Sequence, residues 1–164
     1  MKMRRIYQLV DRLALGYELQ LQRFREMRDL ARRQQEVVRA GGGLHLEEIL
    51  ARRQALMEEI DETGRELSAL REEVQQILHF REFNLEKLKE LVHTPSCTKL
   101  GEILRELAGV IEEIQGCDRE STALLEGQIK AVRGSLQDVR ALRAANQAYQ
   151  AKPPDGGSFL DLKK

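Results

Sequence analysis

The most constraining feature of this sequence is a repeat of apolar residues at alternating spacings of three and four. This spacing keeps one stripe of an α-helix facing a partner helix. The sequence therefore predicts an all-α protein of long helices with coiled-coil packing. In the first 40 residues, the stripe consists of Ile6, Val10, Leu13, Tyr17, Gln20, Phe24, Met27, Ala31, Gln34 and Val38.

Two short segments interrupt the repeat. Gly41–Gly43 ends the first helix, because three glycines disfavour helix and permit the positive φ of a turn. At the second turn, Thr94 is suited to cap a helix that begins at Pro95. We expect helices at about residues 3–40, 44–92 and 95–150, arranged up-down-up as a single three-helix bundle over residues 1–150. A flexible tail is expected over residues 151–164.

The repeat is not uniform along the chain. Its phase slips at residues 79–84, where we expect a kink or short break in the second helix. Polar residues also occupy several positions of the stripe, where they cost stability but fix the register. These positions include Arg53, Thr63, Asp118, Ser121 and Gln128.

Charge is balanced overall but sorted along the chain. The 27 Lys and Arg residues equal the 27 Asp and Glu residues, so no basic field indicates nucleic-acid binding. Residues 1–40 carry a net charge of +5 and residues 44–92 a net charge of −5. We therefore expect the basic first helix to pair with the acidic second helix. No apolar run approaches the roughly 18 residues of a membrane span, so we expect no membrane insertion.

The sequence contains no recognisable catalytic or metal-binding motif. A phosphate-binding loop, a His-Glu-x-x-His motif and a Cys-x-x-Cys motif are all missing. Glu90 and His93 form a single Glu-x-x-His element, whereas a carboxylate di-iron site requires two. Cys97 and Cys117 would lie about 30 Å apart on one helix, too far for a disulfide, which suits a reducing cytosol. We expect no enzyme, no metal and no cofactor.

The expected helix lengths suggest one interaction surface. A first helix of about 57 Å is shorter than a second helix of about 73 Å, at 1.5 Å per residue. The far end of the second helix and the start of the third would then form a two-helix hairpin with an exposed apolar face. The partner-binding residues of this alternative are Leu85, Leu88, Val92, Leu100 and Leu104.

Two passages suggest a different surface. The first is LARRQQEVVRAGGGLHLEEILARRQALMEEIDETGRELSAL, residues 30–70. The second is LGEILRELAGVIEEIQGCDRESTALLEGQIKAVRGSLQDVRAL, residues 100–142, which Tyr149 follows. Together with the glycine turn and the long last helix, they resemble the FlgN-type flagellar export chaperones.

The resemblance implies a cytoplasmic chaperone for the hook–filament junction proteins. Such a chaperone would hold the amphipathic terminal helix of its client until type III export, and would meet components of the export apparatus. The rival class is a structural coiled coil that forms homodimers or larger homo-oligomers without a client. In the chaperone family the C-terminal part binds the client, which on this chain indicates Leu136, Val139, Leu142, Tyr149, Phe159, Leu160 and Leu162.

Overall fold

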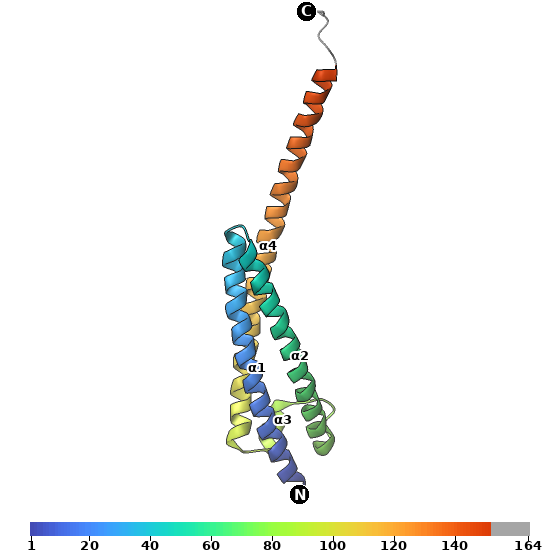
Figure 1. Ribbon diagram of the computed structural model, residues 1–164. Coiled ribbons are helices and arrows are strands. Elements are labelled where there is room, and N and C mark those ends of the chain that lie inside the picture. The colour runs from blue at the N-terminus through green and yellow to red at the C-terminus, as the bar shows by residue number, and fades with distance from the viewer. Residues whose placement is uncertain (152–164) are drawn as a thin grey trace, which may run out of the picture. The chain divides into compact units, whose positions relative to one another are not determined.

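The computed structural model describes residues 1–151, and these form four helices without a strand (Figure 1). The expected all-α class is therefore confirmed for this range. The chain divides into two units, Met1–Ser121 and a second unit that begins at Thr122. A single bundle over residues 1–150 stays a prediction. The helices are α1 (Lys2–Arg39), α2 (Leu44–Leu78), α3 (Leu85–Leu91) and α4 (Pro95–Ala151).

A glycine turn reverses the chain between α1 and α2. Gly41, Gly42 and Gly43 have φ angles of 99°, 82° and 119°, which residues with a Cβ rarely adopt. The two helices then run antiparallel and side by side (Figure 1). The predicted ends of the first helix are correct to within one residue.

The second helix is shorter than predicted. It ends at Leu78, and His79 takes a left-handed conformation with φ 58°. Asn84 then starts α3, because its side-chain oxygen accepts a hydrogen bond from the Lys87 backbone N–H over 3.0 Å. The break expected at residues 79–84, where the apolar repeat slips, is confirmed. It divides the helix predicted over residues 44–92 into α2 and α3. Thr94 caps α4 as predicted and accepts a hydrogen bond from the Cys97 N–H over 3.2 Å.

The early end of α2 removes the predicted exposed hairpin. With 38 residues in α1 and 35 in α2, the two helices have nearly the same length. Leu88, Val92 and Leu100 are at most 1% exposed and belong to the core of the first unit, whereas Leu85 and Leu104 are half-buried against that core. The exposed apolar face expected at these five residues is therefore absent, because the length argument counted residues 79–84 as helix.

Ion pairs explain the sorted charge within the first unit. Arg5 lies 2.6 Å from Glu73, and Arg52 lies 2.6 Å from Glu26, so α1 and α2 are linked along their lengths. A second set joins α1 to the first part of α4, and it advances along both helices in the same direction. This parallel set pairs Glu18 with Lys99, Arg25 with Glu106, Arg28 and Arg32 with Glu113, and Arg39 with Glu120.

Polar residues of the predicted stripe are buried in the first unit, as their positions in the repeat indicate. Gln20, Gln34, Thr63 and Ser121 are all less than 10% exposed. Arg53 connects three helices, because its guanidinium donates to Gln34 of α1 and to Asp118 of α4. These contacts favour one register of the three helices, since a shift along the helix axes would leave buried polar groups without partners.

Candidate functional site

The part of α4 within the second unit carries a row of exposed apolar side chains. Exposed fractions range from 50% at Ile129 and Leu136 to 79% at Tyr149. Consecutive members lie mostly three or four residues apart, which places them along one face of the helix. Exposed apolar faces of this length mark interaction sites in soluble proteins. We call Ile129, Val132, Leu136, Val139, Leu142 and Tyr149 the α4 face.

A shallow hollow lies at the start of the α4 face. It has a volume of about 430 Å³ and lies among the side chains of a single helix. Apolar groups dominate its lining, so it can receive an apolar side chain of a partner. Its residues are Leu125, Gln128, Ile129, Val132 and Arg133.

The sequence also explains why the C-terminal part of α4 is helical. Residues 141–151 contain five alanines, and alanine has the highest intrinsic helix propensity. Gly127 and Gly134 lie earlier in α4, and a Cβ at either position would meet nothing within 4 Å, so close packing does not require them. Local propensity therefore favours the helix around Leu142 and Tyr149.

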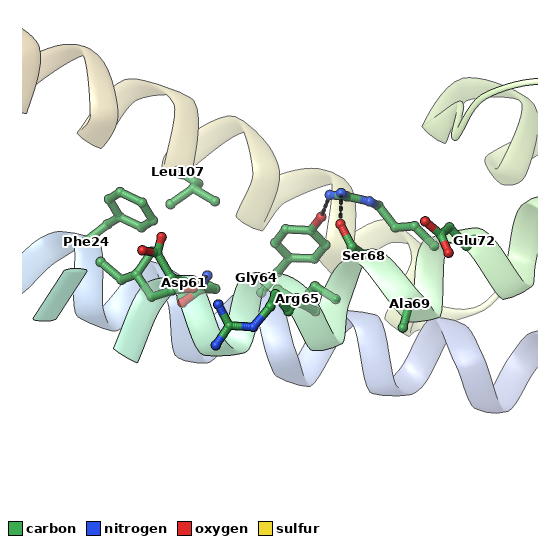
Figure 2. Close-up of a pocket in the computed structure, with 13 residues that line it drawn as sticks. Phe24, Asp61, Gly64, Arg65, Ser68, Ala69, Glu72 and Leu107 are labelled. Atoms are coloured by element: carbon green, nitrogen blue, oxygen red, sulfur yellow. Dashed lines mark hydrogen bonds between the residues drawn. The ribbon is translucent and has the colours of Figure 1, made fainter. Parts of the chain in front are cut away.

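A second hollow lies in the first unit, between α1, α2 and the first part of α4 (Figure 2). Its volume is about 630 Å³, with Phe24 and Leu107 toward one end and Glu72 toward the other. The Arg71 guanidinium crosses it and donates hydrogen bonds to the Tyr17 hydroxyl and to the Ser68 hydroxyl, the latter over 2.9 Å. The bond to Tyr17 links α2 to α1, whereas the bond to Ser68 lies within α2. The guanidinium places a positive charge in the hollow.

The floor of this hollow contains a buried amide. Gln20 donates a hydrogen bond of 2.9 Å to the Ile60 carbonyl, while its side-chain oxygen meets no donor among the described residues. Asp61 and Arg65, four residues apart on α2, lie on the wall. Amide, hydroxyl and guanidinium groups among apolar side chains fit a helix-packing seam, and the described residues bring no three potential metal ligands together.

Perturbed pKa values lie away from both hollows. The hydrogen bond from Arg52 lowers the pKa of Glu26, and that carboxylate raises the pKa of Arg52. Burial raises the pKa of the Cys97 thiol, and Cys97 and Cys117 are both free. Residues 1–151 contain no helix that is both long and apolar enough to cross a membrane.

The predicted partner-binding residues fall into three groups. Leu136, Val139, Leu142 and Tyr149 are exposed and share the α4 face. The alternative set around Leu88 is largely buried. Sequence reasoning missed Ile129 and did not count Val132 as a binding residue, although the same apolar spacing continues through both. The remaining predictions, Phe159, Leu160 and Leu162, lie outside the described residues.

Comparison with known families now identifies the class of protein. A family model described as FlgN protein matches residues 3–153, nearly the whole chain. The chain belongs to the FlgN family. FlgN proteins are a chaperone family of the flagellar export system, so the resemblance noted in the sequence is confirmed. No curated protein and no solved structure gives a significant match.

Proposed function

We propose that this FlgN protein is a cytoplasmic export chaperone for flagellar hook–filament junction proteins. It binds the amphipathic terminal helix of its client and keeps the client soluble until type III secretion. The observation that carries this proposal is the α4 face, an exposed apolar row on a helix that continues to Ala151. An amphipathic helix can lay its own apolar stripe along such a row, with anchors every three or four residues.

The α4 face also supports a binding mode that is reversible. Its side chains are half or more exposed in the free chain, so a partner helix gains apolar burial on docking. The face belongs to one helix, and its concavity is shallow. A docked helix therefore stays partly exposed to water, which suits a chaperone that must release its client at the export apparatus.

The experiment is isothermal calorimetry with a purified hook–filament junction protein. We expect Val139→Ala with Leu142→Ala to weaken binding at least about tenfold, because about five methylene-sized groups leave the interface. Deletion of residues 151–164 tests the contribution of Phe159, Leu160 and Leu162. The matched control is Leu50→Ala, which shortens an exposed leucine of α2. Unchanged affinity in the double variant would reject the α4 face as the client site.

A second candidate function is a structural coiled coil that homo-oligomerises. It draws on the same observation, since two copies can cover each other's α4 faces. A concentration series by analytical ultracentrifugation separates the two functions. A monomer that binds the junction protein supports the chaperone. A stable oligomer that does not bind the junction protein supports the structural coiled coil.

A further inference from the structure

Arginines line one edge of the α4 face. At 100° per residue, Arg133 and Arg140 lie within about 20° of each other and about 90° from Val132. Arg143 lies about 20° from Val132, on the apolar row itself. The other edge is mostly neutral, with Gln128 and Ser135.

These arginines differ in their partners from several arginines of the first unit. Arginines of α1 such as Arg5, Arg25 and Arg28 face carboxylates of other helices. Within the described residues, no ion pair or hydrogen bond involves the side chains of Arg133, Arg140 or Arg143. Residues 122–151 carry four basic and two acidic residues, so their net charge is +2.

We infer that the arginine edge selects client helices that carry carboxylates along one flank of their apolar stripe. This inference rests on the proposed function and names the chemistry of the helix that the α4 face accepts. Guanidinium groups bind carboxylates through two parallel hydrogen bonds, which adds geometric specificity to charge attraction. Charge at the rim of an apolar interface speeds association and discriminates among partners.

The charge argues against an antiparallel second copy as the occupant. When two identical helices pair antiparallel through the α4 face, like edges meet, and Arg133 and Arg140 face arginines of the other copy. Like charges across an interface oppose association. A client helix with glutamates at the matching positions has no such penalty.

The test uses two synthetic helices and the full chain. Both peptides carry the same leucine stripe, and they differ only in Glu or Lys at the flanking positions. Fluorescence anisotropy at low salt should show the Glu peptide binding about tenfold more tightly than the Lys peptide. High salt should remove most of this preference, because exposed charges are screened.

Two charge reversals on the same helix locate the effect. Arg140→Glu should abolish the preference for the Glu peptide. Lys130→Glu changes the net charge equally but lies about 160° from Val132, away from the apolar row, so it should leave most of the preference intact. Equal affinities for both peptides, no binding of either, or equal effects of the two reversals would overturn the inference.

The peptide experiment can fail without contradicting the proposed function. If the junction protein binds and Val139→Ala with Leu142→Ala weakens it, the client site stands whatever the peptides show. If peptide preference is absent under those conditions, only the arginine edge is rejected. The oligomeric state of the parent and of Arg140→Glu is also compared without peptide. A parent dimer that dissociates in Arg140→Glu would assign the arginine edge to self-association instead.

Discussion

The guanidinium of Arg53 on α2 donates two hydrogen bonds to the carboxylate of Asp118 on α4, each 2.8 Å long. The same guanidinium donates to Gln34 of α1 and, through Nε, approaches the Met27 sulfur at 3.2 Å. Arg53 is largely buried, with its side chain 16% exposed. One side chain therefore connects α1, α2 and the first part of α4.

Asp118→Asn should lower the free energy of unfolding by about 1–2 kcal/mol, because it removes a charge partner from a largely buried guanidinium. Urea denaturation followed by circular dichroism measures the change. The control is Asp138→Asn, an exposed aspartate of the same helix for which the expected change is within about 0.5 kcal/mol. Equal effects of both substitutions would contradict a specific role for the Arg53–Asp118 pair.

The glycine turn and an exposed helical glycine should respond to alanine with opposite signs. Gly42→Ala places a Cβ at φ 82° and should destabilise the chain by about 1 kcal/mol or more. Gly109→Ala adds a Cβ that meets nothing within 4 Å, and it should stabilise α4 by about 0.5–1 kcal/mol. Thermal unfolding of both variants checks the signs, and destabilisation by Gly109→Ala would indicate a contact that requires glycine.

The two cysteines should react with thiol reagents at different rates. Cys97 is 1% exposed and burial raises its pKa, so little thiolate is accessible at neutral pH. Cys117 is half-buried. Timed alkylation and mass spectrometry should show Cys117 modified first under native conditions and both modified at similar rates in urea. Faster native labelling of Cys97 would mean that the turn at Thr94–Pro95 opens readily.

The Glu26–Arg52 pair should contribute to stability above acidic pH. Arg52 donates two hydrogen bonds to the carboxylate, of 2.6 and 3.0 Å, and the pKa of Glu26 is lower in the folded chain. Its contribution is therefore complete above the ordinary glutamate pKa and disappears as pH falls through the lowered value. Because the pair is exposed, the effect is small. Urea titrations of the parent and Glu26→Gln should converge at acidic pH; a gap that widens there would contradict the sign.

Local sequence signals predicted the turns well. Thr94 and Pro95 define the start of α4, and Gly41–Gly43 define the first turn, because each acts through its own backbone preference. The slip of the repeat also predicted the break at residues 79–84. The second helix was nevertheless expected to extend to residue 92, since periodicity resumes at Leu85 and does not reveal that a separate short helix follows the break. Burial at Leu88 follows from that tertiary rearrangement, which no local pattern encodes.

The candidate site was only partly predictable for a related reason. The apolar spacing through Leu100 and Leu107 resembles that through Val132 and Val139, yet the first pair is buried and the second exposed. Periodicity reports that a face is apolar and does not report whether a neighbour covers it. The pairing of Arg53 with Asp118 was equally hidden, because the sequence assigns both to the stripe without bringing them together.

The continuity of α4 has a consequence for the kinetics of client capture. Helix formation is limited by its first turn, which fixes several residues for a single hydrogen bond. The buried start of α4, with Cys97, Leu100 and Ile103, provides that nucleus, and residues 122–151 need only propagate it. Under the proposed function, the α4 face is thus already ordered when a client arrives, and the client helix bears most of the entropic cost of folding on binding.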